Sequence, residues 1–249
     1  MAVINPPRAR RVQYPESDGK PLGETDQHRD LMTDLIFALK LFLANVRAYV
    51  AGNLFIYFEE GNPKAVVAPD VFVVLGVQQR QRRIYCSWRE QNRLPDVVIE
   101  LTSKKTRKAD EVSKPALYAR LGVREYFLFD PYGEYLDPRL QGYRLVNGAY
   151  QPMQGYPLNS SVLGLELREE ENAVRLYNPL TGERLPTAAE AELARRAAEA
   201  GRKAAEERLE AEAIARLEAE TRAAEQAARA AAAEAELARL RALLEKKGE

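Results

Sequence analysis

The sequence has little of three features that would assign it to a class at once. It contains one cysteine, Cys86, which excludes an intrachain disulfide and a thiolate-rich zinc site. No apolar run approaches the roughly 18 residues of a membrane span, and the N-terminus lacks the apolar core of a signal peptide. The 37 Lys and Arg residues balance 37 Asp and Glu residues, so the chain lacks the strongly basic charge of a simple nucleic-acid-binding domain. We therefore expect a soluble, cytoplasmic protein.

The 249 residues divide into parts of different composition. Residues 187–249 contain no proline and no aromatic residue, and Ala, Glu, Arg and Leu dominate there. These are strong helix formers, and many Glu–Arg pairs stand three or four positions apart, so we expect one long charged helix. Its large apolar residues are sparse. Two interpretations stay open: a solvated single helix, or a weak coiled coil between chains.

The part before this helix is typical of a globular domain over residues 25–186, preceded by a polar N-terminal arm over residues 1–24. Thr25 can cap a helix that runs to about Asn45, and a second helix over residues 114–121 ends at Gly122. Apolar runs predict strands over residues 48–50, 54–59, 66–67, 71–77, 97–101, 123–129, 142–146, 165–167 and 174–177. We expect an α/β (α+β) fold, in which a mixed β-sheet is flanked by helices, plus the long C-terminal α-helix.

Two acidic residues stand at the ends of apolar runs. Asp70 opens the run VFVV, and Glu100 ends the run VVIE. A carboxylate at the end of a buried strand costs free energy unless something compensates its charge. Two such carboxylates on neighbouring strands can share a hard cation such as Mg²⁺ or Mn²⁺, which keeps several waters and leaves room for phosphate oxygens. The simpler alternative is that each acid meets solvent or pairs with an arginine.

A basic segment follows Glu100. Strand alternation puts Thr102 on the same face as Glu100, and the next residues are SKKTRKADEVSK, with Lys104 and Lys105 near the start. Cations beside a strand-end acid suit phosphate binding. Asp110, Lys114 and Tyr118 are spaced to share one helix face, but Pro115 favours a helix that starts near Lys114, with Asp110 in the loop before it. A charged surface loop is the alternative interpretation.

Further candidates carry a weaker signal. Glu59 closes a predicted strand before a turn, where turn chemistry is favoured over a metal ligand. His28 and Glu24 lie at the start of the first helix, where either could serve the site, but an ordinary capping role is favoured. Residues 78–93 are rich in arginine around Tyr85 and Trp88, a pattern that fits nucleic-acid contact and fits an exposed loop equally well.

Several of these segments together resemble a known family. PDVFVVLGV, PDVVIELTSKKT, the Asp110…Lys114…Tyr118 spacing and ARLGVREYFLFDP are similar to the Uma group of putative restriction endonucleases, in the PD-(D/E)XK nuclease superfamily. The resemblance spans roughly Tyr14 to Leu185. It implies a restriction-endonuclease-like core and a Mg²⁺-dependent phosphodiesterase site, with Asp70 and Glu100 as its two acids.

One position departs from the wider superfamily. The lysine that usually follows the second acid by two residues would stand at position 102, which holds a threonine. The resemblance therefore implies that a lysine from elsewhere reaches the site. Lys114 is the first choice and Lys104 or Lys105 the next, because the D-x-x-x-K-x-x-x-Y spacing belongs to the Uma pattern. Otherwise the chain is inactive.

The leading hypothesis is a Mg²⁺-dependent (or Mn²⁺-dependent) endonuclease that hydrolyses DNA phosphodiester bonds. Asp70, Glu100 and the main-chain carbonyl of Leu101 would hold the metal, and Lys114 would act on the attacking water or the phosphate. The alternative is a catalytically inactive nuclease-fold protein that acts as a nucleic-acid-binding or assembly module through its C-terminal helix. In either case we expect nucleic acid rather than a membrane as the partner, and a homodimer formed through that helix or through the nuclease domain.

Overall fold

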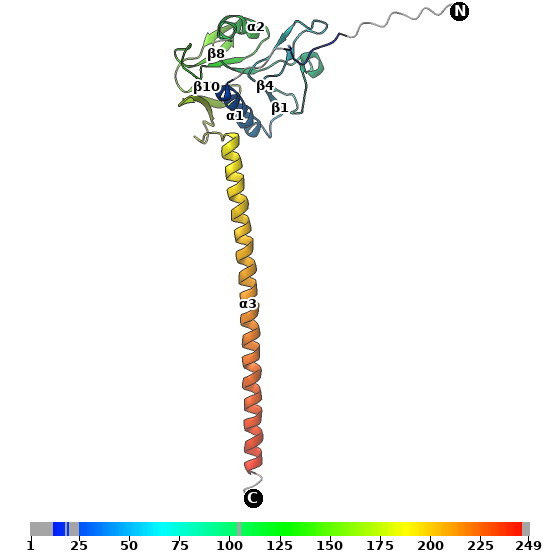
Figure 1. Ribbon diagram of the computed structural model, residues 1–249, viewed down its shortest axis with the longest axis vertical. Helices are drawn as coiled ribbons and strands as arrows, with labels where there is room; N and C mark the ends of the chain where they lie inside the picture. The colour runs from blue at the N-terminus through cyan, green and yellow to red at the C-terminus, as the bar shows by residue number, and fades with distance from the viewer. Residues whose placement is uncertain (1–11, 18, 20–24, 104–105, 246–249) are drawn as a thin grey trace, which may run out of the picture. The chain divides into compact units, whose positions relative to one another are not determined.

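The computed structural model describes residues 12–17, 19, 25–103 and 106–245. The chain forms two compact units, Met1–Glu190 and Ala191–Glu249, which we call the globular unit and the helical unit. Within the described residues, the globular unit contains three β-sheets and the short helices. Nearly the whole of the helical unit is one helix (Figure 1).

Helix α1, Asp26–Phe42, begins where the sequence predicts and ends slightly earlier. The Thr25 hydroxyl accepts a hydrogen bond from the His28 amide at 3.2 Å, which satisfies one of the free N–H groups of the first turn. Leu31, Leu35 and Leu39 recur at three- or four-residue spacing and are buried. This face contacts β1, β4 and β12, so the start of the helix is held against the sheets.

The main sheet has six strands in the order β1-β4-β6-β7-β8-β9. Only β6 and β7 pair in parallel, and the chain crosses between them through helix α2, Lys114–Arg120. The other four pairings are antiparallel, which confirms the mixed sheet. The strands are Ala48–Ala51 (β1), Val71–Leu75 (β4), Val97–Leu101 (β6), Glu125–Phe129 (β7), Leu140–Val146 (β8) and Ala149–Pro152 (β9).

Two smaller sheets complete the globular unit. One has the order β10-β11-β12, formed by Leu158–Ser160, Leu165–Glu170 and Ala173–Tyr177. The other has the order β3-β2-β5, formed by Val66–Val67, Ile56–Tyr57 and Tyr85–Cys86. The sequence predicted neither β10 nor β5. Both are too short to show a period of two, and they depend on pairing with strands far away in the chain.

The arginine-rich segment 78–93 is not simply an exposed loop. It contains β5 and a short 3₁₀-helix, Ser87–Glu90. Tyr85 is fully buried, and its hydroxyl donates to the carbonyl of Arg93 at 2.8 Å. Neither the nucleic-acid contact nor the exposed loop that the sequence left open holds for Tyr85, because this ring belongs to the core.

The main sheet is covered on both faces, and the alternation predicted for β6 is confirmed. Val97, Ile99 and Leu101 pack in the cluster that includes α1. Val98 packs in the opposite cluster with Tyr118 of α2. Glu100 follows the alternation of Val98, so it reaches the α2 side of the sheet, where it is 0% exposed. A fully buried carboxylate at this point requires partners.

Helix α2 is preceded by one π-helical turn, Ala109–Ser113. The expectation that Asp110 lies in a loop is wrong, because Asp110 is in this turn and is buried. The Lys114 amide donates to the carbonyl of Ala109, and the next residue, Pro115, has no N–H to donate. The wider turn thus keeps the chain helical up to the proline, with Asp110 and Lys114 on neighbouring turns.

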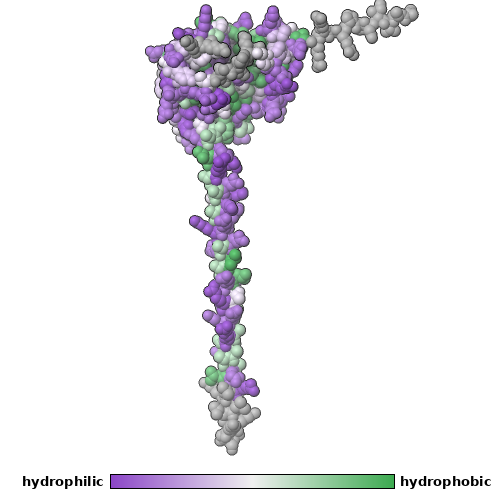
Figure 2. Space-filling model, viewed as in Figure 1, coloured by the Kyte–Doolittle hydropathy of each residue, from purple (hydrophilic) through white to green (hydrophobic). Residues whose placement is uncertain are grey.

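Helix α3, Ala188–Glu245, is the long helix that the composition predicts. Thr187 and Glu190 cap its start reciprocally: the Thr187 hydroxyl accepts from the Glu190 amide, and the Glu190 carboxylate accepts from the Thr187 amide. Its 58 residues give a length of about 87 Å. Figure 2 shows a mostly hydrophilic surface along this helix with isolated hydrophobic spots. None of the helices in the described part of the chain is long and apolar enough to cross a bilayer.

Candidate active site

Asp70 and Glu100 meet where β4 begins and β6 ends. The two strands run antiparallel with Val71 opposite Ile99, so the residue before β4 lies beside the end of β6. The Asp70 amide donates to Oε2 of Glu100 at 3.2 Å, and the Leu101 amide donates to Oδ2 of Asp70 at 2.8 Å. A backbone amide at the end of each strand therefore binds the carboxylate at the end of the other strand. The two acids lie side by side where β4 begins and β6 ends.

Lys114 brings an ammonium group to this pair from α2. Its Nζ lies 3.0 Å from Oε2 of Glu100 and 2.8 Å from Oδ1 of Asp110, and the side chain is 19% exposed. The hydroxyl of Thr102 donates to Oδ2 of Asp110 at 3.3 Å. The threonine is thus linked to the ammonium through Asp110, and a lysine from a different element lies beside Glu100.

Two buried tyrosines donate hydrogen bonds to Glu100 and Asp110. The Tyr118 hydroxyl donates to Oε1 of Glu100 at 2.7 Å, and the Tyr126 hydroxyl donates to the main-chain carbonyl of Asp110 at 2.8 Å. The two rings pack with their centroids 5.4 Å apart. Because each hydroxyl is fixed by its ring packing, Tyr118 orients the Glu100 carboxylate and Tyr126 holds the backbone at Asp110.

His28 approaches Asp70 from α1. Its Nε2 lies 3.4 Å from Oδ1 of Asp70. The site therefore gathers side chains from α1, β6, the π-turn and α2 around the residue before β4. From the sequence, His28 was only an accessory candidate. In the structure it lies directly beside Asp70.

The electrostatic environment separates the two carboxylates. Burial raises the pKa of Glu100 to about 8, against the attraction of Lys114 and with added repulsion from Asp70. Burial also acts to raise the pKa of Asp70, but the hydrogen bond and charge of His28, together with Lys114 and the Leu101 amide, outweigh it, and the pKa lies below the usual value. Two acids in contact with opposite pKa shifts are typical of a functional site.

The same charges act on the lysine. Burial acts to lower the pKa of Lys114, but the nearby carboxylates of Glu100 and Asp110 outweigh it and raise the pKa above its ordinary value. The amine therefore stays protonated at neutral pH. It can donate hydrogen bonds and carry positive charge, but it cannot act as a general base there.

Some sequence candidates do not join this cluster. Glu59 is exposed, and its carboxylate accepts a hydrogen bond from Asn62 in the turn that follows β2. Glu24, Lys104 and Lys105 lie outside the described residues. Leu101 is buried, and its amide binds Asp70.

Sequence reasoning missed two residues. Tyr126 lies within an apolar strand and has no distinguishing local pattern. Gly52 follows β1, and a Cβ built on it would lie 2.0 Å from the carbonyl oxygen of Asp70. Only glycine fits at this point, because the chain after β1 passes directly against the backbone of the first acid. A glycine at the end of a predicted strand was the one signal present.

The donor set suits a hard divalent cation in its chemistry. Asp70 and Glu100 present carboxylate oxygens, and Mg²⁺ binds through one or two carboxylates while retaining waters. The part of the chain that the structure describes contains no group of three or more His, Cys, Asp or Glu residues arranged to hold a metal.

The chain is similar to known proteins. Residues 6–173 match the Uma2 family, described as "Putative restriction endonuclease". No curated protein matches the chain. Among the solved structures, the chain is similar to the crystal structure of a putative nuclease belonging to DUF820 from Anabaena variabilis ATCC 29413. The sequence identity is 14%, the match covers 56% of this chain and 73% of that chain, and the TM-score is 0.40.

Proposed function

Because the chain belongs to the Uma2 family of putative restriction endonucleases, we propose that it is a metal-dependent endonuclease that hydrolyses DNA phosphodiester bonds. The observation that supports this most is the convergence of Asp70, Glu100 and Lys114 from three separate elements. Two acids and a cation at one sheet edge are what phosphodiester hydrolysis needs: a place for a metal, and a positive charge for the reacting phosphate.

Asp70 and Glu100 would hold Mg²⁺ or Mn²⁺, together with the main-chain carbonyl of Leu101. A bound ion of this kind supplies an activated water and polarises the scissile phosphate. The low pKa of Asp70 keeps this carboxylate ionised at neutral pH, so it is ready to bind a cation. Burial favours the protonated form of Glu100, and the positive charge of Lys114 favours the ionised form. A bound cation would add to the effect of Lys114 and favour the ionised form further.

Lys114 would stabilise the charge that develops on the phosphate. Its ammonium group has three donors, and Glu100 and Asp110 account for two of them. Among the described residues the third has no acceptor, so it can reach a water or a phosphate oxygen on the exposed side. In hydrolysis the water oxygen forms a bond to phosphorus, one ester P–O bond breaks, and the leaving oxygen takes up a proton.

His28 and Tyr118 would act by positioning the acids. His28 lies beside Oδ1 of Asp70, and Tyr118 binds Oε1 of Glu100. Each fixes one oxygen of a carboxylate. The other oxygen of Asp70 accepts from the Leu101 amide, and that of Glu100 accepts from the Asp70 amide beside Lys114, so both carboxylates are held in place for a ligand. A Glu100 side chain without the Tyr118 hydrogen bond would have a higher pKa and would bind a cation less well.

A second candidate is a nuclease-fold protein without catalytic activity that binds nucleic acid or assembles through α3. The observation that favours it is Thr102, which stands where the wider superfamily carries its lysine. Under this alternative the contact of Lys114 with Glu100 and Asp110 is a buried structural ion pair. Titration calorimetry with Mg²⁺ and Mn²⁺ separates the two, because a structural ion pair predicts no cation binding at millimolar concentration.

Cleavage of DNA by the full-length protein tests the proposed function. Supercoiled plasmid is incubated with Mg²⁺, with Mn²⁺ or with EDTA, using the parent protein and the variants Glu100→Gln and Asp34→Asn. We expect nicked or linear plasmid from the parent and from Asp34→Asn with metal only, since Asp34 pairs with Arg175 away from these acids. Equal cleavage by parent and Glu100→Gln would show that the site is assigned wrongly.

A further inference from the structure

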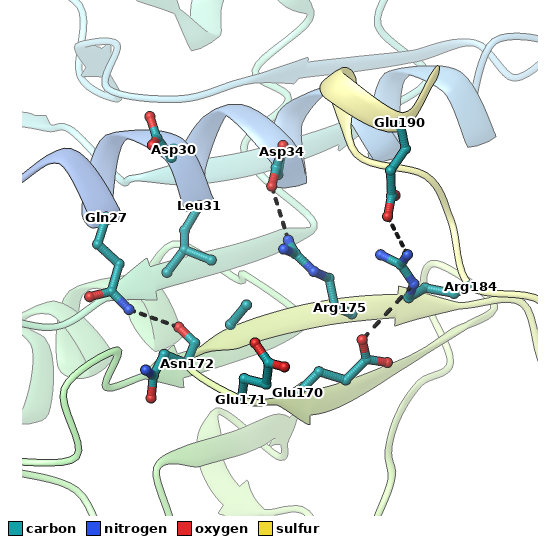
Figure 3. A pocket seen from close by; sticks show the side chains of 11 residues that line it. Gln27, Asp30, Leu31, Asp34, Glu170, Glu171, Asn172, Arg175, Arg184 and Glu190 are labelled. Atoms are coloured by element: carbon teal, nitrogen blue, oxygen red, sulfur yellow. Dashed lines mark hydrogen bonds and ion pairs between the residues drawn. The ribbon is translucent and has the colours of Figure 1, made fainter. Parts of the chain in front are cut away.

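Helix α1 contributes to two hollows of opposite charge in the globular unit. One hollow, of about 980 Å³, is lined by the acids Asp30, Asp34, Glu170, Glu171 and Glu190 together with Arg175 and Arg184. Figure 3 shows that both arginines face acids: Arg175 pairs with Asp34, and Arg184 pairs with Glu190 and Glu170. The acids outnumber the cations, so this hollow repels a polyanion.

The other hollow, of about 770 Å³, is basic. Its lining includes Lys40 of α1 and Arg80, Arg82 and Arg83 of the segment after β4, and no acid is among its lining residues. We call it the basic groove. Its floor is β1, the edge strand of the main sheet, where the Gln79 side chain binds both the amide and the carbonyl of Val50. This pairing closes the strand edge at that point, so a ligand of the groove meets side chains instead of free backbone.

Three of the four cations are positioned to meet a ligand. The side chains of Arg80 and Arg83 are 60% and 84% exposed, and Lys40 is also exposed. Arg82 is different: its side chain is 6% exposed, and its guanidinium packs 4.1 Å from the centre of the Tyr49 ring. Arg82 therefore serves the fold, and the other three form the charged surface.

The ion pairs of the exposed arginines do not block the groove. Arg80 lies 2.6 Å from Glu90, which also pairs with the buried Arg82, and Arg83 lies 2.5 Å from Glu16. The Arg83–Glu16 pair is exposed on both sides and therefore weak, so a phosphate group can replace the Glu16 carboxylate. Glu90 keeps Arg82 as a partner when Arg80 turns to a ligand.

The basic groove adjoins the chain segment that carries Asp70. Gly52 lines the groove, and its backbone passes so close to Asp70 that a Cβ there would meet the Asp70 carbonyl oxygen at 2.0 Å. The next residue binds the same segment, since the Asn53 amide donates to the carbonyl of Pro69 at 2.9 Å. One end of the groove thus lies against the segment that carries the first acid.

We propose that the basic groove binds the phosphodiester backbone of DNA next to the scissile phosphate, through Lys40, Arg80 and Arg83. The choice of ligand rests on the proposed function. The groove offers cations but no aromatic face, because Tyr49 is buried beneath Arg82. It therefore positions the strand through its phosphates and does not read the bases, so its contribution to affinity is the same for every sequence.

Fluorescence anisotropy with a labelled DNA duplex tests this in the full-length protein, with EDTA present so that no cleavage occurs. The variant Lys40→Gln/Arg80→Gln/Arg83→Gln removes the three cations. The matched controls are Arg80→Lys/Arg83→Lys, which keeps the charges, and Arg120→Gln, which removes an exposed arginine outside the groove. Circular dichroism checks that each variant is folded.

We expect the triple variant to bind roughly a hundredfold more weakly at about 0.1 M salt, and its plot of log affinity against log salt to be shallower by about 3. Both controls should bind as the parent does. Parent-like affinity and salt dependence in the triple variant would overturn the proposal, as would a parent protein that does not bind DNA at all.

The two proposals fail separately. Asp70→Asn should bind DNA as tightly as the parent in this assay and yet not cleave it with metal present. If the parent binds through the three cations but never cleaves, the proposed function is wrong and the groove stands. If the parent cleaves and the triple variant binds and cleaves equally well, the groove is wrong and the proposed function stands.

Discussion

The ammonium nitrogen of Lys114 lies 3.0 Å from Oε2 of Glu100, while position 102, two residues after that glutamate, holds a threonine. The positive charge beside the second acid thus comes from α2 and not from β6. Thr102 donates to Asp110, and Asp110 contacts the same ammonium. Thr102 is therefore linked to Lys114 through Asp110.

Replacing this lysine tests the proposed arrangement. We predict that Lys114→Met lowers the rate of metal-dependent cleavage by at least about 100-fold, since one positioned charge-stabilising group contributes on that scale. It should also lower the free energy of unfolding by about 3–5 kcal/mol, because the buried Asp110 and Glu100 both lose the cation that they contact. Lys108→Met is the matched control, since Lys108 is exposed. Parent-like cleavage by Lys114→Met would remove the lysine from the mechanism.

The raised pKa of Glu100 predicts a pH dependence of stability in the metal-free protein. Its value of about 8 lies above the ordinary 4.5, so the folded state holds this proton more tightly than the unfolded state does. The stabilisation is complete below about pH 4.5 and is lost as the pH rises to 8 and beyond, by an amount on the order of a few kcal/mol. Urea unfolding of the parent and of Glu100→Gln between pH 5 and 9 measures this.

The comparison between those two proteins isolates Glu100 from every other titrating group. The glutamine variant keeps the volume of the side chain but cannot ionise, so its free energy of unfolding should fall less over this range. Parallel curves for the two proteins would mean that Glu100 does not change its protonation there.

Gly52 allows a test of backbone placement. We predict that Gly52→Ala destabilises the globular unit and weakens cleavage together, because the new Cβ would lie 2.0 Å from the Asp70 carbonyl oxygen and the backbone must move. Gly201→Ala is the matched control: nothing lies within 4 Å of its Cβ, and alanine in the interior of α3 should stabilise that helix by about 1 kcal/mol. Thermal unfolding and cleavage assays of both variants provide the comparison, and unchanged cleavage by Gly52→Ala would contradict this role.

The apolar residues of α3 predict self-association. Leu209, Ile214 and Leu217 lie within three turns of this helix and are more than half exposed. We expect the full-length chain to sediment as a dimer and a chain ending at residue 186 as a monomer, because helix pairing would cover these side chains. Dimers in both cases would place the interface in the globular unit, and monomers in both would make α3 a spacer or a binding segment for another protein.

Local patterns in the sequence predicted the parts of the fold that depend on local rules. Thr25 caps α1, and β6 alternates between the two faces of the sheet. Each of these follows from the chemistry of a few adjacent residues. The pairing of Tyr85–Cys86 with β2 does not, because a strand of two residues has no period of its own.

The candidate site divides in the same way. The position of Asp70 and Glu100 at strand ends is a local feature, and their approach follows once β4 and β6 are neighbours. The contact of Lys114 with Glu100 depends on how α2 packs across the sheet, so the spacing in the sequence could nominate this lysine but not place it. Gly52 could not be connected with Asp70, because that contact joins two loops whose approach depends on the whole sheet.

The most direct test of the central claim is the single-turnover cleavage rate of an end-labelled DNA duplex as a function of Mg²⁺ concentration, for the parent and for Asp70→Asn. The account predicts a rate that rises with Mg²⁺ and saturates for the parent, and no cleavage above background for the variant, which keeps its fold but loses the ionised acid beside Glu100. Cleavage by the parent that is independent of the divalent ion, or equal rates for the two proteins, would contradict it.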